Sequence, residues 1–186
     1  MMGNVFQINL PLVRDAFPVD HLIRYPSESL DLLNLSDVSK LFLHSIGVPR
    51  KKLLLCKFNQ QVQFLEDYQP EDLVLGLSTI RGNMYVLGCD DQNYICINSA
   101  DTNMVWLLHT SLKIKPKLFG SSIAKLVELF ALYVEYGKKV RKMSEYESDV
   151  IAINVVKKME TTDPLVFEDG NSIWSCITNQ MIDGLL

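Results

Sequence analysis

The chain has 186 residues, of which 48% are hydrophobic and 22% are charged. These proportions exclude intrinsic disorder and fibrous or low-complexity structure, and a chain of this length buries a core without disulfides or metals. A net charge of −4 disfavours strong non-specific binding to nucleic acid or to anionic lipid. We therefore expect one soluble domain over residues 1–186, suited to a basic partner.

The four cysteines contain no C-x-x-C pair, and each lies in an apolar run. A free cysteine in such a setting behaves as a small hydrophobic residue, so we expect buried thiols in a reducing cytoplasm and no metal site. We see no basic leader and no apolar run of the ~20 residues that a membrane span needs, so we expect neither a signal peptide nor a membrane anchor. The cysteines are Cys56, Cys89, Cys96 and Cys176.

The first elements in chain order are weakly marked. Pro11, Pro18 and Pro26 predict an irregular segment over residues 1–35, of extended and turn structure, with one short strand near residues 22–25. Ser36 is a good N-cap for a helix that Gly47 and Pro49 then end. Its predicted apolar face consists of Val38, Leu41, Phe42 and Ile46.

Between residues 53 and 109 the pattern changes to short apolar runs separated by Asp, Asn, Gly and Gln. This predicts a mainly antiparallel sheet of about five or six strands, joined as a meander. Tyr94, Cys96 and Asn98 alternate with Ile95 and Ile97, so one face of the sheet should pack on a core and the other on solvent or a partner. The runs span residues 53–58, 62–65, 73–78, 83–88, 93–98 and 104–109.

Apolar residues at helical spacing return after Ser121 and predict a helix. The basic residues at its far end suit the negative terminus of a helix, and we interpret them as a solvated face. Gly120-Ser121-Ser122 is read as an N-cap rather than as a nucleophile. Ser144 and Glu147 form a capping box for a second helix that ends near Met159. Ser172 caps the last helix, which ends at Gly184 and turns Ile173, Trp174, Ile177 and Met181 to the core.

Catalytic motifs are missing from the sequence. It contains no G-x-S-x-G elbow, no pair of histidines with zinc spacing and no phosphate-binding glycine loop. We therefore expect no enzyme, no catalytic or metal-ligating residues and no cofactor.

Acidic residues concentrate in the predicted sheet region. Residues 51–110 carry four basic and seven acidic side chains, a net −3, whereas residues 111–150 carry eight basic and five acidic ones, a net +3. The adjacent acids of the sheet region are either solvated turn residues, a protein-binding rim, or a metal or catalytic site. Trp106 is either sheet core or the centre of an interface. The adjacent pairs are Asp90 and Asp91, Glu66 and Asp67, and Glu71 and Asp72.

Four stretches carry a family resemblance. They are LFLHSIGVP at 41–49, the strand pair RGNMYVLGCDDQNYICINSADTNMVWLLH at 81–109, LFGSSIAKLVELFALY at 118–133, and the tail DPLVFEDGNSIWSCITNQMIDGLL at 163–186. In this order they resemble the SUKH superfamily of bacterial immunity proteins, particularly its fourth branch, over residues 36–186. Val48 stands where that branch usually has Leu, and the loop after Pro49 is unusually basic.

The resemblance implies an α+β, SUKH-like fold with helices packed around the sheet. It also implies a cytoplasmic, non-enzymatic protein that neutralises the toxic domain of a polymorphic toxin, often a nuclease or nucleic-acid deaminase. We expect this toxin domain as the partner, with no direct contact to nucleic acid or membrane. The acidic loops, Asp90 and Asp91 foremost, would form the toxin-facing rim. A general protein-interaction or scaffold module of the same fold, and a small hydrolase, are the alternatives.

Overall fold

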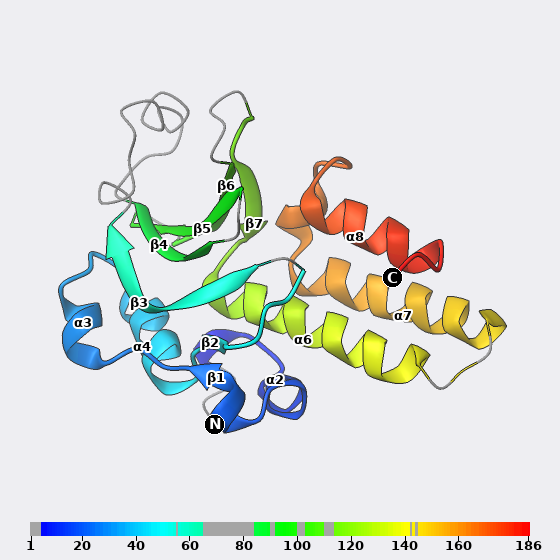
Figure 1. Ribbon diagram of the computed structural model, residues 1–186, viewed down its shortest axis with the longest axis horizontal. Coiled ribbons are helices and arrows are strands. Elements are labelled where there is room, and N and C mark those ends of the chain that lie inside the picture. The colour runs from blue at the N-terminus through cyan, green and yellow to red at the C-terminus, as the bar shows by residue number, and fades with distance from the viewer. Residues whose placement is uncertain are drawn as a thin grey trace.

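The computed structural model describes residues 5–54, 56–64, 84–89, 92–99, 103–109, 114–141, 143 and 145–186. Helices lie below and beside a central sheet (Figure 1). The N-terminal half contains α2 (Leu10–Ala16), η1 (Val19–His21), β1 (Leu22–Ile23), α3 (Ser27–Asp31), α4 (Asp37–Ser45), β2 (Val48–Pro49) and β3 (Lys57–Phe64). The rest contains β4 (Met84–Cys89), β5 (Asn93–Asn98), β6 (Val105–His109), β7 (Lys117–Gly120), α6 (Ile123–Val140), α7 (Glu145–Thr162), η3 (Pro164–Phe167) and α8 (Ile173–Ile182).

The central sheet confirms the predicted α+β class. Within the described residues it has five strands in the order β3-β4-β5-β6-β7, and every neighbouring pair is antiparallel. Two runs expected as separate strands, 53–58 and 62–65, contribute residues 57–58 and 62–64 to the single strand β3, which shifts register between Phe58 and Gln63. The run at 73–78 lies outside the described residues.

Both faces of the middle strand β5 are buried over residues 95–98, whereas we expected one face of the sheet to meet solvent or a partner. Ile95 and Ile97 of β5 belong to the main apolar core. Cys96, on the opposite face, is equally buried in a smaller cluster with residues of β4 and β6, and Asn98 is buried too. The period-two alternation of β5 therefore separates two buried surfaces.

The segment 1–35 was predicted as irregular, and this is wrong for the described part. The short strand is confirmed as β1, but α2 and α3 flank it. Pro11 lies in the first turn of α2, and Pro26 is the N-cap of α3. Proline is tolerated at these positions because the first N–H groups of a helix have no intrahelical partner, so these prolines begin helices instead of excluding them.

Helix α4 begins at the predicted cap, where the Ser36 hydroxyl accepts a hydrogen bond from the Ser39 N–H at 3.2 Å. The face that it buries differs from the prediction. Val38 and Leu41 are 47% and 44% exposed, while Ser39, Phe42 and Leu43 face the core. Burial therefore follows residues 39, 42, 43 and 46, a face rotated from the predicted one, because α4 packs against α3 and α6 and Phe42 meets the ring of Phe6.

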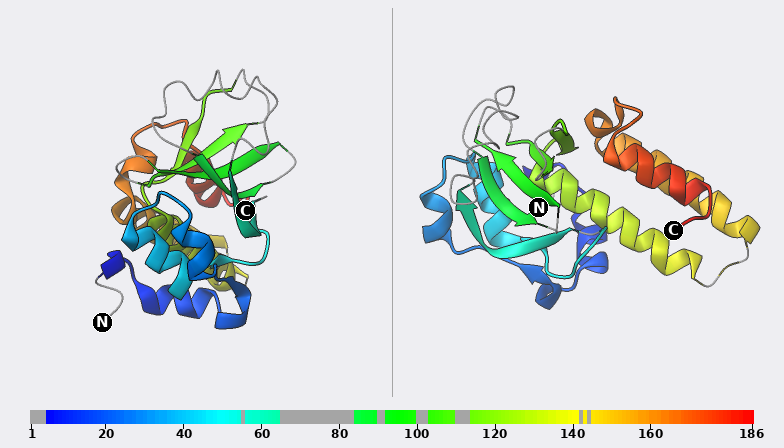
Figure 2. Two further views of the ribbon diagram at one scale, coloured as in Figure 1. Left: turned by 90° about the vertical axis from the view of Figure 1, so that its left-hand side faces the viewer. Right: turned by 45° about the horizontal axis from the view of Figure 1, so that its top comes forward.

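Helices α6 and α7 pack side by side and extend beyond the sheet, with α8 against α7 (Figure 2). The predicted serine caps are present: Ser122 accepts from the Lys125 N–H and Ser172 from the Ser175 N–H. Ser144, the predicted cap of α7, lies outside the described residues. Trp174 of α8 is fully buried, where it stacks on Phe119 of β7 and meets the ring of Phe130 of α6 edge-on. These three rings join the C-terminal helix to the sheet.

Candidate partner-binding surfaces

The six acids predicted as a binding rim lie outside the described residues: Asp90, Asp91, Glu66, Asp67, Glu71 and Asp72. The strands to which they connect are described, and Cys89, which precedes Asp90, pairs with Lys57 at the start of β3. The stretch containing the other four acids leaves β3 at its opposite end, where Phe64 pairs with Tyr85. The eight residues of β3 run from one of these ends to the other, a distance of about 23 Å at 3.3 Å per residue. The two groups of acids are therefore attached at opposite ends of the sheet.

Trp106, the remaining predicted contact, lies on β6 and pairs with Cys96 of β5 and Leu118 of β7. Its side chain is half-buried and packs, with that of Tyr94, against the smaller apolar cluster of the sheet. The indole nitrogen is shielded from solvent and has no hydrogen-bond partner among the described residues. Trp106 thus contributes to packing on the face opposite α6, and a role in an interface stays a prediction.

Two other acids are buried and have structural roles. The Glu128 carboxylate of α6 accepts a hydrogen bond from the Asn9 N–H at 3.0 Å, and its second oxygen lies 3.7 Å from the Lys125 ammonium. Asp163, which follows α7, accepts from the Ser121 N–H at 2.8 Å. Each carboxylate ties a distant segment to the first turn of α6 or to its approach. Their burial removes them from any partner-facing surface.

Burial raises the pKa of Asp163 above its usual value, although the hydrogen bonds from Ser121 and the charge of Lys125 oppose the shift. The folded protein therefore binds this proton more tightly than the unfolded chain does. The contribution of Asp163 to stability is complete below the unfolded pKa of about 4 and is lost as the pH rises through the higher folded value.

We expect Asp163→Asn to remove this pH dependence, because the amide keeps an acceptor for the Ser121 N–H but does not titrate. The stability of the variant relative to wild type should be highest at pH 7 and should fall as the pH is lowered toward 4. Urea unfolding of the variant and the wild type between pH 4 and pH 7 measures this difference in the free energy of unfolding. A difference in unfolding free energy that stays constant with pH would contradict the prediction.

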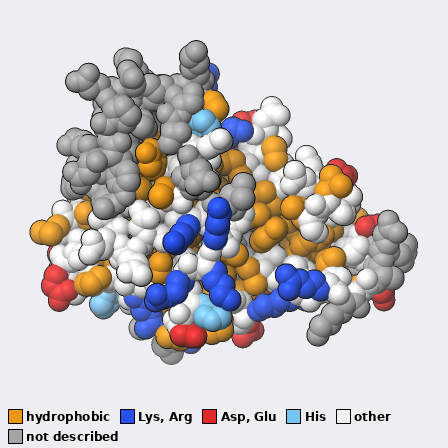
Figure 3. All heavy atoms as spheres, in the orientation of Figure 1, with side chains coloured by type: hydrophobic (Ala, Val, Ile, Leu, Met, Phe, Trp, Pro, Cys, Tyr) orange, Lys and Arg blue, Asp and Glu red, His pale blue; other side chains and the backbone are white. Residues whose placement is uncertain are grey.

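A groove of about 480 Å³ lies between the β2–β3 connection, the second half of α6 and the C-terminal residues. Apolar side chains and two tyrosines form much of its lining: Leu53, Tyr133, Val134, Tyr136, Val140 and Leu186. Figure 3 shows this apolar band reaching toward α8, with Lys and Arg side chains gathered beside it over the β2–β3 connection and α6. The lining contains Lys138 and Arg141 and no carboxylate side chain.

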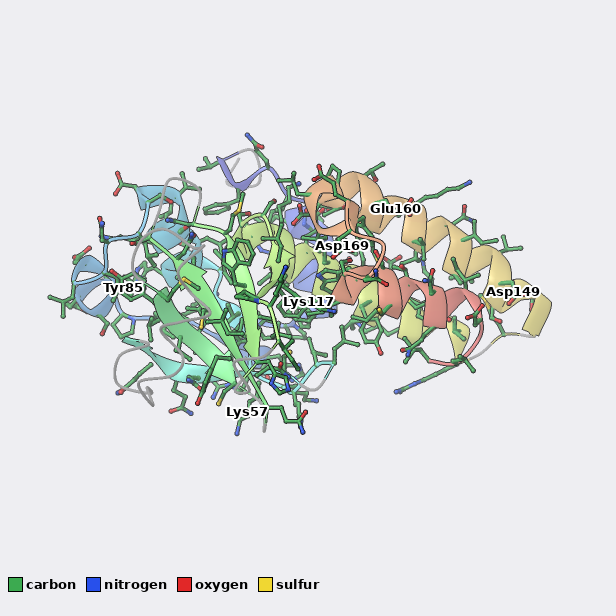
Figure 4. The ribbon with its side chains drawn as sticks, turned by 90° about the horizontal axis from the view of Figure 1, so that it is seen from above. Lys57, Tyr85, Lys117, Asp149, Glu160 and Asp169 are labelled. Carbon is green, nitrogen blue, oxygen red and sulfur yellow. The ribbon has the colours of Figure 1, made fainter. Side chains whose placement is uncertain are left out.

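The charge around the groove is positive. Arg50, Lys51 and Lys52 precede Leu53 and are exposed, as are Lys138 and Arg141. Among the described residues none of these five cations is paired with a carboxylate. Exposed acids gather elsewhere: Figure 4 shows Asp149 and Glu160 along α7 and Asp169 just beyond it, whereas Lys57 lies on the side of the sheet.

Gly137 lines the same groove in the interior of α6. A Cβ atom added there meets nothing within 4 Å, and the backbone is helical, so neither sterics nor backbone conformation requires glycine. Glycine in a helix interior costs about 1 kcal/mol relative to alanine. Our sequence analysis assigned the basic end of α6 to a solvated face and missed the groove. The signals available were this glycine and the basic run at 50–52.

Other kinds of site find little support. In the part of the chain that the structure describes, no three His, Cys, Asp or Glu side chains are grouped to hold a metal ion. The described helices include none long and apolar enough to cross a membrane. All four cysteines carry thiols, but only Cys56 and Cys96 are buried. Cys89 is half-buried, and Cys176 is exposed because it lies on the outer face of α8.

Comparison with known proteins supplies the family. The sequence model of the SUKH-4 immunity protein family matches residues 10–180. No curated protein and no solved structure shows significant similarity. The match covers α2 through most of α8, so it includes the N-terminal helices as well as the stretches on which the resemblance rests. Because it covers far more than half of the chain, this protein belongs to the SUKH-4 immunity protein family.

Proposed function

We propose that the protein binds the toxic domain of a cognate bacterial polymorphic toxin, a nuclease or nucleic-acid deaminase, and neutralises it by covering its active site or substrate surface. The observation that carries this proposal is the family match over residues 10–180. The protein acts by binding and not by catalysis. The buried thiols of Cys56 and Cys96 suit action in the reducing cytoplasm.

The direct test is co-expression with the toxin domain encoded by the neighbouring gene. The toxin domain alone should stop growth, and this protein should restore growth and co-purify with it. A protein that restores no growth and binds no toxin domain would contradict the proposed function. It would favour a general protein-interaction module of the same fold.

The acidic side chains form the proposed steering surface. A toxin that acts on nucleic acid presents a basic substrate surface, and carboxylates opposite such a surface accelerate association and favour the correct partner. Asp90 and Asp91 are the stronger candidates, because Cys89 before them pairs with Lys57, at the end of the sheet that adjoins the groove through Leu53. Trp106 belongs to the same proposal as an apolar contact.

We expect Asp90→Lys combined with Asp91→Lys to weaken toxin binding by about tenfold or more at low salt, because like charges would then face each other. The loss should shrink as salt screens the charges. Titration calorimetry at two salt concentrations measures both effects. Glu71→Lys combined with Asp72→Lys makes the same change of charge at a segment attached to the other end of the sheet. If affinity and salt dependence stay unchanged for Asp90 and Asp91, these residues do not face the toxin.

A further inference from the structure

We propose that the groove beside α6 receives an acidic, amphipathic segment of the toxin domain, with the apolar side chains of that segment in the groove and its carboxylates on Lys138 and Arg141. This inference rests on the proposed function, since it names the part of the partner that is bound. It differs from the steering surface of the acidic loops in both place and charge.

The lining determines the chemistry of the occupant. Leu53, Val134, Val140 and Leu186 present apolar surface, which only apolar side chains cover favourably. Of the two tyrosines in the lining, Tyr136 is almost fully buried and donates its hydroxyl to the Met181 carbonyl at 3.1 Å, which leaves only the ring of Tyr133 partly exposed. One partly exposed ring does not form the series of rings on which successive nucleic-acid bases stack. A peptide segment with one apolar face satisfies this lining, as in other complexes in which a helix lies in a groove.

Charge complementarity indicates that the bound segment is negatively charged. Two cations and no carboxylate side chain line the groove, and three further exposed cations precede Leu53. Lys138 donates to the Asp15 carbonyl at 2.9 Å and also lines a neighbouring pocket with Asp15 and Glu135, so it lies at the rim of the groove. Carboxylates of a partner can neutralise these charges, and such complementarity favours one partner over others.

Gly137 is the independent observation. The fold has room for a Cβ at this position and tolerates a helical side chain, yet the residue that lines the groove is the one without a side chain. Because Gly137 has no side chain, the groove stays open at the middle of its lining. A partner side chain that enters the groove gives the missing reason for a glycine that weakens the helix.

The first experiment uses position 137, with the full-length protein and the catalytically inactivated toxin domain encoded by the neighbouring gene. Gly137→Trp fills the groove and should weaken toxin binding by about tenfold or more. Gly137→Ala adds only one methyl group to the groove and should weaken binding by less than Gly137→Trp does. Thermal unfolding of both variants shows that each is folded. A photo-crosslinking residue at position 137 should then attach to a toxin peptide rich in Asp and Glu.

The second experiment reverses charge. Lys138→Glu combined with Arg141→Glu should weaken binding by about tenfold or more at low salt. Lys157→Glu combined with Lys158→Glu makes the same change on exposed residues of α7, outside the groove, and should bind within about twofold of wild type.

The outcomes separate this inference from the proposed function. If the wild-type protein binds the toxin domain and both groove variants bind equally well, the groove inference is wrong and the proposed function stands. If the wild type binds no toxin domain, both are wrong. Self-association of the wild type that Gly137→Trp abolishes would assign the groove to a second copy of this chain. Nucleic-acid binding that depends on Arg141 would assign it to a phosphate backbone. Either result would overturn the inference.

Discussion

Gly47→Ala is expected to lower the free energy of unfolding by at least about 3 kcal/mol, a large fraction of the 5–15 kcal/mol typical of a domain. Gly47 ends α4 with a φ of +91°, where side chains are rarely accommodated. An added Cβ would also lie 2.1 Å from the Ile23 carbonyl oxygen. That carbonyl belongs to β1, which pairs with β2 directly after the glycine, so the backbone cannot move away without breaking the pair.

The control for this prediction is Gly137→Ala, the same substitution within α6. It should raise the free energy of unfolding by about 1 kcal/mol, since the site is helical and open. Chemical denaturation of the two variants and the wild type measures the direction of both changes in the free energy of unfolding. Equal effects at the two positions would show that the close approach of β1 to Gly47 has been misjudged.

Trp174→Ala is the second large effect, with an expected loss of about 3–5 kcal/mol. The side chain is 0% exposed, and its indole N–H donates to the Phe119 carbonyl at 2.8 Å. Phe119 is the extra residue at a register shift between β6 and β7, where strand pairing leaves a backbone group without its ladder partner. Trp174 therefore supplies both the packing and the hydrogen bond that join α8 to the sheet.

Two phenylalanine substitutions separate these contributions. Trp174→Phe keeps an aromatic ring but leaves the Phe119 carbonyl without its donor, at a cost of about 1–3 kcal/mol. Trp106→Phe removes an indole N–H that has no partner among the described residues, so it should lie within about 1 kcal/mol of wild type. Urea unfolding compares them. If Trp106→Phe destabilises as much as Trp174→Phe, the hydrogen bond is not the distinguishing feature.

Local signals were sufficient for some elements and insufficient for others. The caps at Ser36 and Ser172 and the end of α4 at Gly47 were predictable because each depends on a few neighbouring residues. The buried face of α4 was mispredicted because its packing against α3 and α6, which are separate elements, decides that Leu43 is buried and Leu41 exposed. The N-terminal helices were missed because Pro11 lies in a first turn and Pro26 is an N-cap, positions where proline is as compatible with a helix as with a loop.

The candidate binding surfaces were also predictable only in part from local signals. The sequence analysis singled out the acidic pairs by adjacency, but only the strand register shows that Asp90 and Asp91 attach at one end of the sheet and Glu71 and Asp72 at the other. The groove had no continuous signal, since Leu53, Gly137 and Leu186 come from three distant parts of the chain. Their juxtaposition depends on the packing of α6 and α8 beside the β2–β3 connection.

The sequence by itself determined the α+β class, the helix caps, the antiparallel meander and, through the order of its motifs, the SUKH resemblance that the family match confirms. These features depend on local periodicity and on the order of elements along the chain. Tertiary structure decided that both faces of β5 are buried, that Trp174 donates a hydrogen bond to the bulged residue Phe119, and that basic residues border an apolar groove. Such features arise where segments distant in the chain meet, and no local pattern records which segments meet.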